Sequence, residues 1–172
     1  MKRGIINVKD IVINDGSRNI KLCHNVLNVM FKYIQQGGLS KEAGGILIGK
    51  ENMSNSNLII NNITTPMEHD DSRYNRFIRR DKRHITYFNT FYNKSKRTLR
   101  YLGEWHTHPV AVPIYSSIDL KNWEKIYCGA AYKNSYYHII VGYEIVRIWK
   151  FEHMGQRPQL VGYFSWEDIK GE

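Results

Sequence analysis

Two spacings of apolar residues alternate along the chain and predict a mixture of helices and strands. From Leu22 to Ile34 the apolar residues recur three to five positions apart, which predicts a helix with one buried face. Gly37-Gly38 follows this segment and would end the helix as a left-handed cap. Before the helix, a short strand is expected at residues 5–8 or 10–14, with a turn at Asp15-Gly16.

Short apolar runs separated by turns predict that much of the remaining chain forms strands. The predicted strands cover residues 44–49, 58–64, 99–106, 136–141, 145–151 and 159–164, with a turn over residues 51–57. Two further helices are expected, one over residues 80–93 with Ile85 on its apolar side, and one that begins at Ser116 or Ser117. Residues 66–79 are polar and are expected to be irregular. The pattern predicts one α+β domain over residues 1–172, with a mostly β core and about three helices.

Composition limits the class of protein. A chain of 172 residues with 42% hydrophobic residues suffices for one packed domain and excludes wholesale disorder. Its longest apolar runs, such as residues 46–48, are far shorter than the roughly 18 residues of a membrane span. The basic N-terminus lacks an apolar segment, so no signal peptide is expected. Cys23 and Cys128 are not a disulfide framework, and Cys128 is expected to be a core thiol. We expect a cytoplasmic protein that does not bind membranes.

The charge of the chain is unevenly distributed. The 25 Lys and Arg against 16 Asp and Glu give a formal net charge of +9, and the stretch from Arg73 to Arg100 holds the whole excess. A basic balance first suggests nucleic acid as a partner. Because the excess is local, an acidic protein is the better expectation, with Arg73, Arg79 and Arg80 as substrate-binding residues. A solvated basic face without a partner stays open as the alternative.

Two histidines in the predicted strand that ends near residue 106 are candidate metal ligands. Residues i and i+2 of an extended strand point to the same side, so His106 and His108 would present two imidazoles together. Neutral imidazole is a good ligand of Zn²⁺, and a catalytic zinc site needs three protein ligands. Asp119 in the first turn of the next helix can supply the third, because Pro109 and Pro113 restrict the intervening loop.

Each of these features also has an ordinary structural explanation. A His-x-His pair can arise by chance, and Ser116-x-x-Asp119 is also a capping box that satisfies helix amides. Glu42, which precedes an apolar strand, can be an exposed turn carboxylate. The acidic cluster at residues 68–71 can bind a second metal, although a solvated loop is the favoured interpretation. Trp105 would point away from the neighbouring histidines and into the core.

Taken together, these residues resemble the signature of the JAMM metalloprotease family, also called MPN⁺ or JAB. That signature is Glu, a long gap, His-Ser/Thr-His-Pro, a short gap and Ser-x-x-Asp, and the chain has Glu42, residues 106–109, Ser116 and Asp119 in that order. The likeness covers about residues 20–150. It implies a cytidine-deaminase-like fold, in which three helices flank a mixed, curved β-sheet.

A narrower likeness concerns the residues around these motifs. Residues 103–109 with Trp123, and residues 63–66 followed by Asp71 and Phe77, are similar to the bacterial JAMM peptidases of type II CBASS antiphage operons. This likeness implies an isopeptidase or endopeptidase that cuts at the C-terminus of a conjugated CD-NTase-type or ubiquitin-like protein. It would work beside activating- and conjugating-enzyme-like partners. Processing of a ubiquitin-like precursor and a non-catalytic binding scaffold stay open as alternatives.

The residues and the resemblance agree on one mechanism. His106, His108 and Asp119 would hold one Zn²⁺ per chain, which lowers the pKa of its bound water toward about 7. Glu42 would be the general base, and the Ser116 hydroxyl would stabilise the oxyanion. A nucleic-acid deaminase is disfavoured because the chain has no H-x-E…P-C-x-x-C arrangement, and the absence of H-E-x-x-H excludes zincins.

Overall fold

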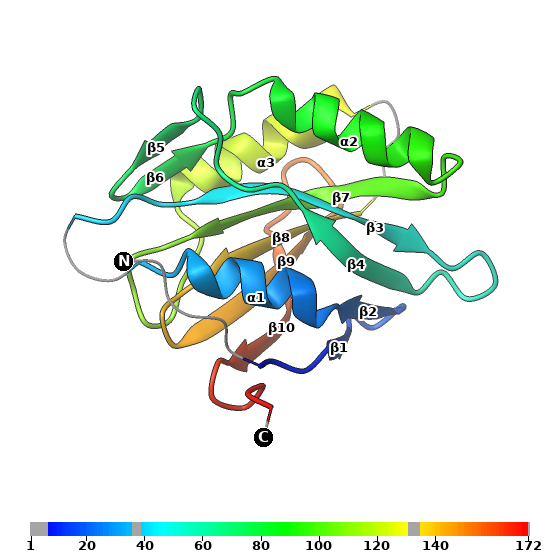
Figure 1. Ribbon diagram of the computed structural model, residues 1–172, viewed down its shortest axis with the longest axis horizontal. Coiled ribbons are helices and arrows are strands. Elements are labelled where there is room, and N and C mark those ends of the chain that lie inside the picture. Colours follow the sequence, from blue (N-terminus) through cyan, green and yellow to red (C-terminus); the bar gives the residue numbers. More distant parts are fainter. Residues whose placement is uncertain (1–6, 36–38, 131–134, 172) are drawn as a thin grey trace.

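The computed structural model describes residues 7–35, 39–130 and 135–171, which form ten strands and three helices (Figure 1). The strands are β1 (Ile11–Asn14), β2 (Asn19–Leu22), β3 (Gly44–Glu51), β4 (Leu58–Ile63), β5 (Asp71–Arg73), β6 (Arg76–Ile78), β7 (Leu99–Thr107), β8 (Tyr136–Val141), β9 (Ile145–Phe151) and β10 (Gln159–Ser165). The helices are α1 (His24–Lys32), α2 (Arg83–Lys94) and α3 (Ser117–Gly129).

Eight of the strands form one mixed sheet in the order β1-β2-β4-β3-β7-β8-β9-β10. The pairs β2–β4 and β7–β8 are parallel, and the other neighbours are antiparallel. The sheet curves so far that its two edge strands come into contact. The backbone of Gly162 in β10 lies against the side chain of Ile13 in β1. This curved sheet with three helices is the α+β architecture that the sequence predicts. The short strands β5 and β6 pair with each other as a separate hairpin.

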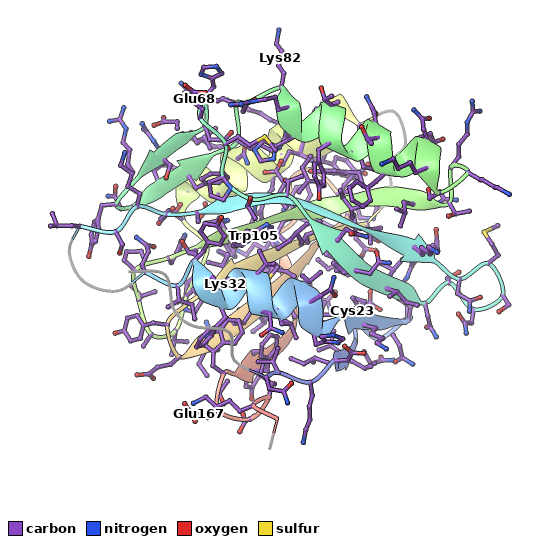
Figure 2. All side chains as sticks on the ribbon, viewed as in Figure 1. Cys23, Lys32, Glu68, Lys82, Trp105 and Glu167 are labelled. Carbon is purple, nitrogen blue, oxygen red and sulfur yellow. The ribbon has the colours of Figure 1, made fainter. Side chains whose placement is uncertain are left out.

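Different helices cover the two faces of the sheet (Figure 1). Leu27 of α1 joins a core on one face that includes Trp105 of β7. On the other face, α2 packs through Phe88 and Phe91, and α3 packs through Trp123. Trp105 lies in the middle of the molecule and is fully buried (Figure 2), which confirms that it is a core residue.

A bulge in the central strand β7 decides which of its residues face α2 and α3. The register between β7 and β3 shifts at this point, so that Leu102 is an extra residue in β7. Leu102 packs in the core beneath α1, whereas Tyr101 packs on the α2 side. One extra residue shifts the alternation of a strand by one position. The bulge therefore turns Glu104 and His106 toward the face that α3 covers. Gly103 completes it with φ of +140°, a conformation that L side chains rarely adopt.

The N-terminal elements differ from the prediction at one point. Leu22, predicted to begin a helix, ends the strand β2, and α1 begins only at His24. Ile20 and Leu22 are two residues apart and both fully buried, which is the alternation of a strand. Residues 10–14 contain β1, as one of the two alternatives predicted. The predicted cap at Gly37-Gly38 lies outside the described residues.

The expectation of an irregular segment over residues 66–79 is wrong, because this segment contains the β5–β6 hairpin. The hairpin lacks an apolar period because its strands are short and mostly polar. An ion pair between Arg76 and Asp71, 2.7 Å long, joins the two strands, and Phe77 is the buried apolar residue within them.

The start of α2 is organised by buried polar groups, not by the predicted apolar side. His84 is fully buried, while Ile85 is 44% exposed. The two ring nitrogens of His84 meet the Asp70 carboxylate, at 2.8 Å, and the Thr64 hydroxyl. The expectation of a solvated loop at residues 68–71 is therefore wrong for Asp70, whose side chain is buried.

Cys128, predicted to be a core thiol, is exposed near the end of α3, so this prediction is wrong. The neighbouring Tyr127 fills the buried position of that helical turn, and the Cys128 Sγ atom lies 3.6 Å from the Sδ atom of Met154. No helix in the described parts of the chain is long and apolar enough to span a bilayer.

We expect Gly103→Ala to destabilise the protein by about 2 kcal/mol, because the added Cβ atom would require a rare φ and would clash with the Tyr137 carbonyl. The matched control is Gly129→Ala at the end of α3, where a Cβ atom meets nothing and the change is neutral or slightly stabilising. Chemical denaturation of both variants measures the difference. Equal stabilities for the two variants would show that β7 tolerates a side chain at the bulge.

Candidate functional site

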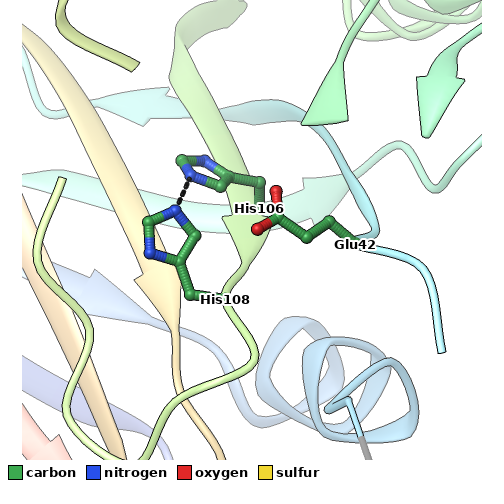
Figure 3. Close-up of side chains that lie close together, drawn as sticks. All are labelled: Glu42, His106 and His108. Carbon is green, nitrogen blue, oxygen red and sulfur yellow. Dashed lines mark hydrogen bonds between the residues drawn. The ribbon is translucent and has the colours of Figure 1, made fainter. Parts of the chain in front are cut away.

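Two imidazoles and one carboxylate converge where β7 ends and α3 begins. The Nε2 atom of His106 lies 3.0 Å from Nε2 of His108 and 3.1 Å from Oδ1 of Asp119. Nε2 of His108 lies 3.3 Å from Oδ2 of the same carboxylate. The extended backbone of residues 106–108 sets both rings on one side, as predicted. Figure 3 shows the rings facing each other, with the Glu42 side chain directed toward them.

The Asp119 carboxylate is held by the N-terminus of α3. Ser116 is the N-cap of this helix and forms the predicted capping box: the Asp119 backbone N–H donates to the Ser116 hydroxyl, and Oδ2 of Asp119 accepts from the Ser116 backbone N–H at 2.6 Å. The Ser116 hydroxyl also donates to Oδ2, at 2.7 Å. The capping role and a ligand role of Asp119 therefore coexist, because Oδ1 remains directed at His106.

Burial and charge act in opposite directions on this cluster. Burial raises the pKa of Asp119, but the neighbouring His106 and His108 outweigh it and hold the pKa well below its usual range. Burial lowers the pKa of His106, and the negative charge of Asp119 outweighs that effect and raises it. The carboxylate thus stays ionised, and its negative charge favours a positive charge between the three groups.

Ala43, the residue after Glu42, links Glu42 to β7 through hydrogen bonds. The backbone N–H of Thr107 donates to the Ala43 carbonyl at 2.8 Å, and the Ala43 N–H donates to the Thr107 hydroxyl at 2.9 Å. Thr107 lies between the two histidines, and Ala43 follows Glu42. The hydroxyl in the middle of the His-Thr-His motif therefore fixes the distance between the acid and the histidines.

The β5–β6 hairpin holds Glu42 from the other side. The Glu42 N–H donates to the Arg73 carbonyl at 2.7 Å, and the Ser72 hydroxyl donates to the Glu42 carbonyl. A hydrogen bond from the Phe77 N–H also acts on the Glu42 carboxylate. Glycine is needed at position 44, next to these hydrogen bonds, because a Cβ atom there would overlap the Phe77 ring. The segment expected to be irregular is thus the part of the chain that positions the acid.

Glu42 has the environment of a general base. Its side chain is 3% exposed, and burial raises its pKa to about 8, although the charge of His106 and the Phe77 N–H act to lower it. The negative charge of Asp119 adds to the increase. Burial thus makes the Glu42 carboxylate a stronger base, and a metal cation held by the neighbouring histidines and Asp119 would favour its ionised, proton-accepting form.

The donor set fits a zinc ion. Ligand atoms about 2.0–2.1 Å from zinc in a tetrahedral site are about 3.3 Å apart. The separations of 3.0, 3.1 and 3.3 Å between the atoms of His106, His108 and Asp119 are close to this value. The ligand atoms of Glu42 and the two histidines also lie within 4.8 Å of one another. Asp119 is the better third ligand because its carboxylate contacts both rings.

All five predicted catalytic and ligand residues therefore lie together, whereas the three predicted substrate-binding arginines differ among themselves. Arg73 and Arg80 have side chains that are 67% and 62% exposed, on the hairpin and just before α2. Arg79 is mostly buried, and its Nε atom donates to Glu104 at 2.6 Å. Contacts of these residues with a substrate stay a prediction.

Sequence reasoning missed Thr107 and Glu104. The family motif allows Ser or Thr between the histidines, so the shared hydroxyl was a usable signal for the role of Thr107. Glu104 lies in a predicted strand with several apolar residues, so its carboxylate is expected to be buried. A buried carboxylate requires a charged or hydrogen-bonding partner. The identity of that partner, Arg79, follows only from the fold.

The profile of the family described as prokaryotic homologs of the JAB domain matches residues 30–152. The chain belongs to this family, and the resemblance found in the sequence is confirmed.

Three curated relatives share the name CD-NTase/cGAS isopeptidase. The Escherichia coli protein is 32% identical over 69% of this chain and 75% of its own length. The Vibrio cholerae protein is 33% identical over 59% of this chain and 64% of its own. The Pseudomonas aeruginosa protein is 27% identical over 75% of this chain and 80% of its own. The solution structure of protein DSY2949 from Desulfitobacterium hafniense covers 69% of this chain and 75% of its own at 18% identity, with a TM-score of 0.48.

We expect zinc to stabilise the metal-free protein, by about 2.7 kcal/mol at a free concentration one hundred times its Kd. His106→Ala, His108→Ala and Asp119→Asn should each lose most of this effect, because each removes one donor. His153→Ala, an exposed histidine after β9, is the control and should keep it. Thermal denaturation with and without zinc measures the shift. An equal shift in all four variants would show that zinc binds elsewhere.

Proposed function

We propose that this protein is a zinc-dependent isopeptidase that releases a CD-NTase-type or ubiquitin-like protein, conjugated through its C-terminus, in a bacterial antiphage system. The observation that carries the proposal is the buried convergence of Glu42 with His106, His108 and Asp119 on a JAB-family sheet. The relatives named CD-NTase/cGAS isopeptidase support the substrate class. The same chemistry would make the enzyme an endopeptidase toward a linear peptide bond.

Each residue of the site has a distinct role in this proposal. His106, His108 and Asp119 hold the zinc ion, which when bound supplies a Lewis acid that activates water and polarises the scissile carbonyl. Glu42 accepts the proton of the attacking water and delivers it to the leaving amine. The Ser116 hydroxyl, which donates to Oδ2 of Asp119 in the structure, would turn to donate to the oxyanion, and its place at the N-terminus of α3 favours negative charge there.

The setting of the enzyme is also part of the proposal. Residues 1–172 would act as a single domain, and the contact between β1 and β10, which lie near opposite ends of the sequence, supports this. The enzyme would work in the cytoplasm. Activating- and conjugating-enzyme-like proteins would supply the conjugate. Arg73 and Arg80, exposed beside the hairpin that holds Glu42, would contact an acidic surface of the conjugated protein.

We expect Glu42→Gln to lower kcat by roughly 100-fold or more while zinc stays bound, because the amide cannot accept the proton. Cleavage of a purified conjugate on gels and zinc content by mass analysis measure the two effects. Glu167→Gln, an exposed acid after β10, is the control. Wild-type cleavage by Glu42→Gln would contradict the base assignment, and a zinc-loaded wild type that cleaves nothing would favour the binding scaffold.

We expect the double variant Arg73→Gln/Arg80→Gln to raise KM for the conjugate about threefold at low salt with kcat within about twofold, because the two arginine charges steer binding and do not touch the scissile bond, and a neutral amide beside Asp71 does not repel it. Lys96→Gln/Arg97→Gln at the opposite end of α2 is the matched control and should leave KM unchanged. Steady-state kinetics at two salt concentrations measure the effect, which salt should reduce. Equal changes in both double variants would contradict a local contact.

A further inference from the structure

Glu104 is a buried acid that the proposed reaction does not use. It lies in β7 two residues before His106, and its side chain is 8% exposed. A buried carboxylate is costly unless it is paired and hydrogen-bonded. Its partners therefore indicate why the chain keeps a charge at this position.

The partners of Glu104 come from two other segments. Oε1 accepts from the Arg79 guanidinium at 2.6 Å, and Oε2 accepts from the Asn122 side-chain amide at 3.4 Å. Arg79 directly follows β6, and Asn122 lies in α3. One carboxylate thus joins the hairpin, the central strand and the third helix.

Each of these three segments carries a part of the site. The β5–β6 hairpin, which ends just before Arg79, holds Glu42 through its backbone and Ser72. The strand carries His106. Asn122 is one helical turn after Asp119, so a shift of α3 at Asn122 moves Asp119 with it. Glu104 and its two partners therefore lie in or next to the three elements that position Glu42, His106 and Asp119.

We propose that Glu104 is a positioning residue, which through Arg79 and Asn122 fixes the distances between Glu42, His106 and Asp119. The expected effect on kcat rests on the proposed function, whereas the expected effect on zinc affinity rests only on the geometry of the three ligand side chains. The shape of the Arg79 guanidinium is part of the proposal. Arg presents a rigid fork to the carboxylate, whereas Lys presents a point charge on a flexible stem.

A purely structural ion pair would behave differently. Replacing one partner of any buried pair destabilises a protein, because the other charge is left without compensation. The chain offers a matched example in Lys150 of β9, whose side chain is 8% exposed, as is that of Glu104. Lys150 contacts Asp15 at 3.3 Å and Glu152 at 2.8 Å, away from the site. Lys150→Met is therefore the control for a variant that loses a buried ion pair and stability but leaves the site residues in place.

The test compares Glu104→Leu, Glu104→Gln, Arg79→Lys and Lys150→Met at a temperature where each is folded. We expect Glu104→Leu to lower kcat and zinc affinity each by about 10- to 100-fold, with KM within about twofold of the wild type. Glu104→Gln, whose carbonyl oxygen can still accept from Arg79 and whose NH2 group can donate to the Asn122 side chain once that amide is flipped, should recover most of the loss, and Arg79→Lys should fall between them. Lys150→Met should lose stability and keep kcat and zinc affinity.

Two readouts keep the outcome decisive. Steady-state kinetics give kcat and KM, and titration of the metal-free protein with zinc gives an affinity that needs no substrate. If Glu104→Leu loses only stability, as Lys150→Met does, the positioning role is overturned. If the wild type cleaves no conjugate, the proposed function fails, while the zinc titration still decides the role of Glu104.

Discussion

The path of β7 through its bulge is the constraint on which the rest of the site depends. If the same residues ran as a regular strand with no bulge at Leu102, strict alternation would turn Glu104 and His106 toward α1 and the large apolar core. Gly103 makes the shift possible because its φ of +140° excludes a side chain. The strand therefore serves two faces: its first half packs beneath α2, and its second half presents polar groups to α3.

Glu42 and the proposed metal ligands are held to each other through hydrogen bonds to the backbone of residues 42 and 43. Thr107 binds Ala43 on one side of Glu42, and the hairpin binds the Glu42 backbone on the other. All these contacts are made to backbone groups of residues 42 and 43, two of them by the Thr107 and Ser72 hydroxyls, and together they fix the start of β3. The Glu42 carboxylate itself accepts a hydrogen bond from the Phe77 N–H, and burial keeps its pKa high in spite of it. The contacts that set the position of Glu42 are thus largely separate from the burial that raises its pKa.

Sequence reasoning predicted the residues that meet in the candidate site better than the elements that hold them. His106, His108, Ser116 and Asp119 were predicted from residue type and spacing, which are local properties, whereas Glu42 was assigned through the family signature. The β5–β6 hairpin was missed because its stability comes from backbone pairing and ion pairs, which leave no apolar period. β2 was missed because Leu22 fits both a helical step and a strand alternation. The pairing of Arg79 with Glu104 could not be predicted, since 25 residues separate the partners.

The fold also changes the meaning of the positive charge. The basic stretch that looks continuous in sequence is divided by α2, whose 12 residues span about 18 Å. At the hairpin end, Arg73 and Arg76 contact Asp71, and Arg79 contacts Glu104. Lys82, the N-cap of α2, points away from the protein there (Figure 2). Lys94, Lys96 and Arg97 lie at the other end, where the negative pole of the helix favours cations. Part of the charge therefore builds the site, and part stabilises a helix, so net charge alone does not define a binding face.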